Sequence, residues 1–165
     1  MMKDDFSFME TTMKRLLQTI VMMTAIAVGS AAAADAERAN AKDAVAMVKK
    51  VIADMKKLGK DKVIQEIQTQ SLQYRDRDLY VSVGTLDGMS LANGNNAKMA
   101  GKNIIDLKDL DGKLITRERI EIAKTKGSGW QDYKWPDPVT KAVQKKSMYV
   151  ERYEDMTVAC GIYKD

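Results

Sequence analysis

The spacing of apolar side chains changes along this chain, and that change limits the fold more than any other feature. From Glu37 to Leu58 apolar residues recur every three or four positions, as on a helix that buries one face. Between Leu79 and Gly84 aliphatic residues occupy every second position, which is the period of a strand. A chain with both periods in separate segments has to combine helix and sheet in one core, so we expect an α+β fold.

Turn residues divide the rest of the chain into short elements. The expected helices cover residues 37–58, 61–70 and 116–126, and the expected strands cover residues 79–84, 89–92, 129–135, 143–151 and 156–163. Asp61 is the expected N-cap of the second helix. Asp87-Gly88 and Pro136-Asp137-Pro138 are expected turns, and residues 97–114 form a long connection. Because tight turns join most neighbouring strands, we expect the sheet to be antiparallel.

An uncharged apolar run follows two basic residues near the N-terminus. Lys14 and Arg15 precede the run at residues 16–28, and small residues follow it as far as Ala34. The order of basic, apolar and small residues is typical of a secretory signal peptide. We therefore expect residues 1–34 to be removed near Ala34, which leaves a periplasmic domain over residues 35–165.

The first twelve residues do not match this pattern, because Asp4, Asp5 and Glu10 are acidic where a signal peptide is basic. We therefore predict that translation starts at Met13. A buried N-terminal helix and an uncleaved membrane anchor are the alternatives for the apolar run.

The residue types that most catalytic and metal sites need are scarce. The sequence has no histidine and one cysteine, Cys160, which we expect to be a small buried apolar residue. No disulfide can form within the chain, a zinc site has almost no ligands, and histidine-based acid–base catalysis is excluded. The sequence has a net charge of +4 and no run of five residues of like charge, which argues against nucleic acid as a partner. We expect no catalytic residues, no metal and no cofactor.

Three aromatic residues and a lysine make up the candidate binding site. Trp130, Tyr133 and Trp135 lie within six positions of one expected strand. Alternation along the strand places Tyr133 and Trp135 on one face and Trp130 on the other. They either fill the core or form the wall of a small pocket, and the sequence favours neither. Lys146 lies on the strand that follows. It is either a solvated edge charge, which the residues alone favour, or an ammonium group that enters the pocket and binds an anion.

The connection also partly resembles a calcium-binding loop over residues 107–118. Asp109, Asp111, Gly112 and Glu118 occupy four of the required positions. The first position is Leu107, which has no side-chain oxygen. The sequence therefore favours a plain Asp-Gly turn.

Several segments, in their order along the chain, resemble the single Cache domain family. They are Asp76 to Val81, Asp87-Gly88, Gly101 to Asn103, Gly127 to Trp130, Tyr133 to Thr140, Lys146 to Glu151 and Gly161 to Tyr163. The resemblance covers nearly all of residues 37–164. It implies a long N-terminal helix packed on a PAS-like antiparallel sheet of about five strands. It also implies an extracytoplasmic sensor of small organic acids.

By position, the resemblance implies a set of ligand-binding residues. These are Tyr133, Trp135 and Lys146, followed by Tyr80, Trp130 and Tyr149. Asn93 belongs to the same set, although the family often has histidine there, so a neutral amide takes the place of an imidazole. Since side chains alternate along a strand, Lys146 and Tyr149 share a face only if the strand contains a bulge.

The resemblance implies a function in signal transduction. Because no signalling module follows the resemblance in this sequence, we expect a free periplasmic binding protein. It would present its small-carboxylate-bound state to a membrane receptor or a transporter. The alternative is a protein–protein interaction module without a working pocket, which forms a homodimer through the apolar stripe of residues 41–58.

Overall fold

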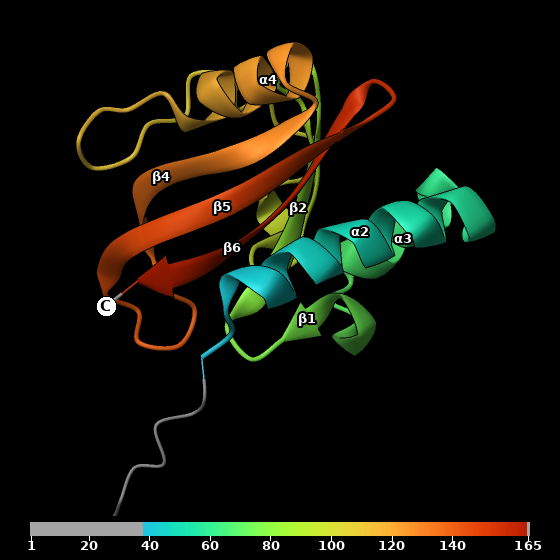
Figure 1. The fold of residues 1–165 in the computed structure, drawn as a ribbon, viewed down its shortest axis with the longest axis horizontal. Coiled ribbons are helices and arrows are strands. Elements are labelled where there is room, and N and C mark those ends of the chain that lie inside the picture. The colour runs from blue at the N-terminus through green and yellow to red at the C-terminus, as the bar shows by residue number, and fades with distance from the viewer. Residues whose placement is uncertain (1–37, 165) are drawn as a thin grey trace, which may run out of the picture. The chain divides into compact units, whose positions relative to one another are not determined.

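A computed structural model describes residues 38–164 of the protein, in which helices cover both faces of an antiparallel sheet (Figure 1). The strands are β1 (Arg75–Asp76), β2 (Leu79–Thr85), β3 (Ser90–Asn93), β4 (Ser128–Pro136), β5 (Val143–Tyr153) and β6 (Met156–Lys164). The sheet has the order β1-β2-β6-β5-β4, and β3 also pairs with β2. This arrangement confirms the predicted α+β class and antiparallel sheet.

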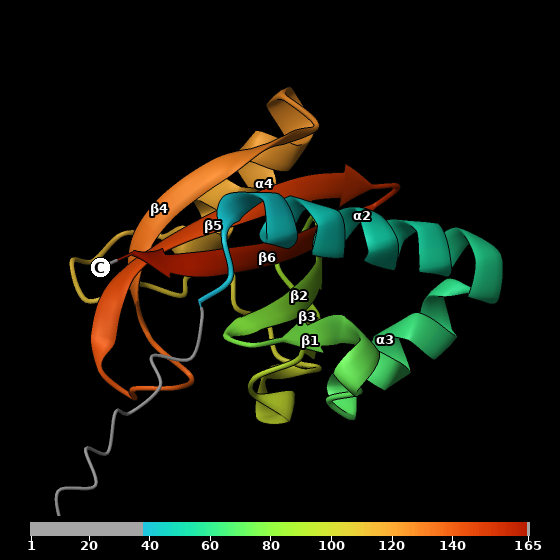
Figure 2. The same cartoon turned by 60° about the horizontal axis from the view of Figure 1, so that its bottom comes forward.

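The helices divide into two groups. They are α2 (Ala41–Leu58), α3 (Lys60–Gln68) and α4 (Ile115–Thr125), with short 3-10 helices η1 (Leu72–Tyr74) and η2 (Ala97–Met99). Helix α2 crosses one side of the sheet and α4 lies on the other, as the two views in Figures 1 and 2 show. The two sides are called the α2 face and the α4 face below.

Helix α2 is capped at its start and buried along one side. The side chain of Asn40 accepts hydrogen bonds from the backbone of Lys42 and Asp43, and Asp43 bonds back to the Asn40 amide. This cap explains why the helix begins at Ala41 rather than at residue 37. The buried stripe packs on β5 and β6 and consists of Ala44, Val48, Val51, Ile52 and Met55. Because the domain uses this stripe internally, the packing does not support the alternative that the stripe joins two chains.

Strand β2 is buried on both sides of the sheet. Leu79, Val81 and Val83 belong to the apolar cluster under α2, together with the buried Cys160. The intervening Tyr80 is also buried, with 3% of its surface exposed, and it points to the α4 face. A strand covered on both sides can carry polar atoms only where they have partners, which makes the α4 face the place to look for a site.

The structure differs from the predicted elements in two details. Asp61 does not cap α3, because the helix already begins at Lys60 and Gly59 precedes it without a side-chain hydrogen bond. The sheet has six strands rather than about five, because the two residues of β1 pair with Tyr80 and Leu79. A two-residue strand has too short a pattern for its period to be recognised.

The predicted signal peptide, its cleavage near Ala34 and the start at Met13 lie outside the described residues. Within residues 38–164, the helices are too short or too polar to cross a membrane.

The turn at Gly88 tests how closely the 97–114 connection packs against the turn between β2 and β3. Gly88 has φ +97°, and a Cβ atom there would lie 2.7 Å from Cβ of Ile105, whereas Gly101, with φ +75°, has nothing within 4 Å. We expect Gly88→Ala to lower the free energy of unfolding by about 1–3 kcal/mol more than Gly101→Ala, since both share the cost of positive φ and only one adds a steric clash. Urea denaturation measures the difference; equal losses would contradict the close packing of the 97–114 connection.

Candidate functional site

A small cavity lies on the α4 face, enclosed by the sheet, helix α4 and the 97–114 connection. Its lining residues are Tyr80, Ser82, Asn93, Met99, Ile104, Leu107, Ile115, Arg119, Tyr133, Trp135 and Met148. Its volume is about 20 Å³, which is room for roughly one water molecule. An apolar wall with a few polar groups is the usual composition of a small-molecule site.

The pairing of β4 with β5 determines which aromatic residues reach this cavity. Tyr133 pairs with Lys146 across the hairpin, so both point to the α4 face. Trp135 follows on the same face, and its ring meets that of Tyr133 edge-on, with the ring centroids 6.0 Å apart. The Tyr133 hydroxyl donates to Sδ of Met148 over 3.5 Å. The aromatic hairpin therefore forms one wall of the cavity.

Trp130 and Tyr149 lie on the opposite side of the sheet. They pair across β4 and β5, with ring centroids 5.4 Å apart, and Tyr149 packs against the cluster under α2. Strand alternation separates Tyr149 from Lys146, as the sequence indicated, and no bulge interrupts the pairing of β4 with β5. These two residues therefore do not line the cavity with Tyr133 and Trp135.

Lys146 is fully buried directly behind the cavity wall. Its Nζ lies 3.8 Å from the centre of the Tyr80 ring and 4.5 Å from that of Tyr163, and it donates a hydrogen bond of 3.2 Å to the Tyr163 hydroxyl. Burial lowers the pKa of Lys146 from its usual value of 10.5 to about 7, and the positive charge of Arg119 acts in the same direction. The prediction of a solvated edge charge is therefore wrong.

Lys146 has no carboxylate partner among residues 38–164, since none of the ion pairs in that region includes it. Asp78 and Asp137 lie near enough to raise its pKa somewhat. However, Nη1 of Arg38 already holds both, at 3.4 Å from Asp78 and 2.5 Å from Asp137. The ammonium group is thus stabilised mainly by aromatic rings and one hydroxyl.

Arg119 brings a second buried positive charge to the cavity, and only 7% of its surface is exposed. Its Nε donates to Oε1 of Gln131 over 3.3 Å and its Nη1 to Oγ of Ser82 over 3.5 Å, both long for hydrogen bonds. In the described part of the chain it forms no ion pair either. The cavity wall therefore includes a weakly satisfied guanidinium group.

Asn93 closes a turn as well as lining the cavity. Its Oδ1 accepts hydrogen bonds from the backbone amides of Asn95 and Asn96, at 3.0 and 2.9 Å. Among residues 38–164, its Nδ2 has only the sulfur of Met99 as an acceptor, 3.6 Å away. The amide therefore presents a hydrogen-bond donor, and not a titratable imidazole, to the cavity.

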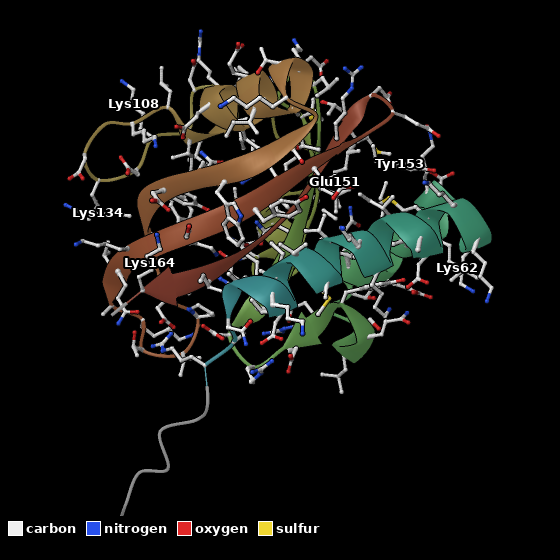
Figure 3. The ribbon with its side chains drawn as sticks, in the orientation of Figure 1. Lys62, Lys108, Lys134, Glu151, Tyr153 and Lys164 are labelled. Atoms are coloured by element: carbon white, nitrogen blue, oxygen red, sulfur yellow. The ribbon has the colours of Figure 1, made fainter. Side chains whose placement is uncertain are left out.

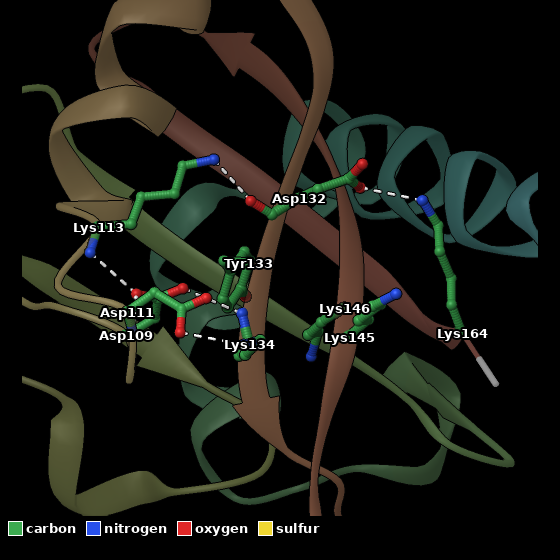
Figure 4. Close-up of a pocket in the computed structure, with 9 residues that line it drawn as sticks. All are labelled: Asp109, Asp111, Lys113, Asp132, Tyr133, Lys134, Lys145, Lys146 and Lys164. Atoms are coloured by element: carbon green, nitrogen blue, oxygen red, sulfur yellow. Dashed lines mark hydrogen bonds and ion pairs between the residues drawn. The ribbon is translucent and has the colours of Figure 1, made fainter.

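A second hollow of about 240 Å³ lies where the 97–114 connection meets β4 (Figure 4). Its lining residues are Asp109, Asp111, Lys113, Asp132, Tyr133, Lys134, Lys145, Lys146 and Lys164. Figure 4 shows Lys145 and Lys146 pointing away from each other across β5. The hollow thus adjoins the buried lysine but belongs mainly to exposed charges.

The charges of this second hollow largely neutralise one another. Lys134 pairs with Asp111 at 3.0 Å, and Lys164 pairs with Asp132 at 3.1 Å. Lys134 and Lys164 project into solvent at one end of the sheet (Figure 3). Water and carboxylates already solvate these cations, so an anion gains little by binding them. The buried cavity is the stronger candidate site.

The segment over residues 107–118, which partly resembles a calcium-binding loop, contains a turn held by Asp109. The carboxylate of Asp109 accepts hydrogen bonds from the backbone amides of Asp111, Lys113 and Lys134. These bonds fix the connection against β4, as expected of an Asp-Gly turn.

Arg119 is not among the residues predicted from the sequence, although its position carries a signal. In helix α4 the buried positions include Ile115, Arg119, Ile122 and Ala123, spaced as one face of a helix. An arginine in the middle of an apolar stripe indicates a buried cation or a functional group. Of the predicted residues, the structure brings together Tyr80, Asn93, Tyr133 and Trp135 at the cavity, with Lys146 behind it.

Known proteins share this fold. The family model for single Cache domain 2 matches residues 10–165. A stretch of 98 residues, 58% of this chain, is 24% identical to the methyl-accepting chemotaxis protein McpP of Pseudomonas putida. The match spans 18% of the length of McpP, so it concerns one part of that receptor.

Two solved structures illustrate the likeness. A methyl-accepting chemotaxis protein from Vibrio parahaemolyticus has a TM-score of 0.66 and 22% identity, covering 75% of this chain and 88% of that one. A Cache chemosensory domain described as recognising carboxylic acid has a TM-score of 0.60 and 23% identity, covering 75% and 88%. At these identities the structures establish the fold alone. Since the family model covers nearly the whole sequence, the chain belongs to the single Cache domain 2 family of extracytoplasmic sensory domains.

Proposed function

We propose that this domain senses a small carboxylate that binds in the α4-face cavity and pairs with Arg119. The observation that carries the proposal is the presence of two buried cations, Arg119 and Lys146, without a carboxylate partner in the described chain. A buried charge is costly unless it is paired, and an anionic ligand supplies the missing charge.

The remaining wall favours a short organic acid over an inorganic anion. Tyr133, Trp135 and Met148 offer apolar surface next to Arg119, and the donors of Asn93 and Ser82 lie on the other strands. A carboxylate can accept two N–H groups of one guanidinium while its alkyl part contacts the aromatic rings. Because the cavity is only about 20 Å³, an acid of two to four carbons requires the 97–114 connection to move outward.

The family relationship supports a role in signalling. McpP is a methyl-accepting chemotaxis protein, and the Cache domain of similar fold is described as recognising carboxylic acid. We propose that this chain acts in the periplasm, without catalysis, and that a membrane receptor or a transporter reads its liganded state.

Substitution of Arg119 tests the ligand assignment. Loss of a charge-assisted hydrogen bond costs about 1.5–3 kcal/mol, so Arg119→Gln should weaken binding of acetate, propionate or butyrate at least about tenfold. Thermal unfolding with and without each acid measures this, because a ligand that binds the folded state raises the unfolding temperature.

Arg117→Gln is the matched control, since Arg117 lies on the same helix with its side chain exposed and paired with Asp106. We expect its response to ligand to equal that of the wild type. If no acid stabilises the wild type, or if Arg119→Gln responds undiminished, the carboxylate proposal is wrong.

The buried ammonium predicts an unusual dependence of stability on pH. The pKa of Lys146 is about 7 in the folded protein, against about 10.4 in an unfolded chain. Between these values the unfolded state binds more protons, so this group makes the free energy of unfolding rise with pH. Lys146→Met removes the effect, and we expect it to stabilise the unliganded protein by a few kcal/mol at pH 6, decreasing towards pH 10.

Urea denaturation at pH 6, 8 and 10 measures this trend, with Lys145→Met as the control because the neighbouring Lys145 is exposed. Lys145→Met should change stability little and equally at each pH. A Lys146→Met effect that does not vary with pH would show that the ammonium is not desolvated.

A further inference from the structure

We propose that Tyr163 is a positioning residue of the sensor, whose hydroxyl fixes the ammonium of Lys146 next to the ligand cavity. This inference rests on the proposed function for its role in binding. Tyr163 lies on β6, with 5% of its surface exposed, and does not itself line the cavity. It acts on the ligand through Lys146.

The hydrogen bonds around Tyr163 leave one consistent arrangement. Its hydroxyl donates to the carbonyl oxygen of Pro136 over 2.8 Å. A phenol has a single O–H, so its oxygen must act as acceptor in every other bond. Lys146 can only donate, and it lies 3.2 Å away. The Tyr80 hydroxyl, at 3.4 Å, then also acts as a donor to Tyr163.

This arrangement gives Tyr163 a defined orientation. It donates its proton to the backbone carbonyl oxygen of Pro136, which cannot rotate away. Both lone pairs of its oxygen therefore face Lys146 and Tyr80. A lysine side chain loses rotamer entropy when it is held in one place, and a fixed acceptor at its tip reduces the number of alternative rotamers.

The stem of Lys146 is confined by the same strand. Gly161 lies two residues before Tyr163, and a Cβ atom there would be 2.9 Å from Cε of Lys146. Because Gly161 has no side chain, the aliphatic part of Lys146 can pass over β6, and its ammonium group reaches the Tyr163 hydroxyl. The ring of Tyr80, which lines the cavity, lies 3.8 Å from the ammonium nitrogen on another side.

A positioning role differs from a purely structural one in what it does to Lys146. Tyr163→Phe keeps the ring and its contact with the ammonium but removes the acceptor and the bond to Pro136. Loss of an acceptor for the charged form lowers the pKa of the lysine, whereas a general loss of stability does not. NMR titration of the Lys146 side chain reports this directly, with Lys146→Met used to assign the signal.

We expect Tyr163→Phe to lower the pKa of Lys146 and to weaken acetate binding by about tenfold, with a larger loss at pH 8 than at pH 6. Tyr149→Phe is the control, because its hydroxyl bonds to Glu151 on the α2 face. We expect it to leave both the lysine pKa and the acetate affinity unchanged.

Tyr80→Phe provides a second variant that retains the Tyr163 acceptor. The arrangement above predicts a smaller decrease in the Lys146 pKa than in Tyr163→Phe. If Tyr163→Phe does not fold, Tyr80→Phe alone decides. A decrease in the Lys146 pKa of about one unit or more in Tyr80→Phe overturns the proposal, and a smaller decrease supports it.

An unchanged Lys146 titration in folded Tyr163→Phe would also overturn the proposal, even with a lower unfolding temperature. If the wild type binds no acetate, propionate or butyrate but the titration shifts as expected, the ligand assignment fails while the positioning of Lys146 stands.

Discussion

The register of β4, β5 and β6 is the constraint on which the α4 face depends. In this register Lys146 lies between Tyr133 on β4 and Tyr163 on β6, with its side chain on the α4 face. A shift by one residue would turn every side chain of β5 to the opposite face and place Lys146 in the apolar cluster under α2. Each of the three strands is nine residues or longer, so many backbone hydrogen bonds oppose such a shift.

The two faces of the sheet differ in the kinds of residue that they bury. Under α2 and α3 the buried residues are almost all aliphatic, including Val48, Val51 and Val81, which is the packing that stabilises a domain of this size. The α4 face instead contains Arg119, Gln131 and Lys146, all buried. Stability supplied on one side allows the other to keep polar groups that are poorly paired until a ligand arrives.

The fold could be predicted because its signals are local. The helical spacing that ends at Leu58 and the alternation that begins at Leu79 each repeat over several residues, and both elements are found in the structure. The site was harder to predict from the sequence, because it depends on which faces of the helices and strands come into contact. Alternation placed Tyr133 and Trp135 together. The helical spacing around Arg119 indicates that its side chain is buried, but nothing local indicates that it lies against β2, which starts forty residues earlier.

Two different cations at one site have complementary properties under the proposed function. Arginine remains charged at every physiological pH, so Arg119 always offers an electrostatic partner. Lys146, with a pKa of about 7, is charged in only about half of the unliganded molecules near neutral pH. A bound carboxylate favours its protonated form, so ligand binding and proton uptake become linked. The affinity for an acid then decreases as the pH rises above 7, because an increasing share of the binding energy is spent on protonating the lysine.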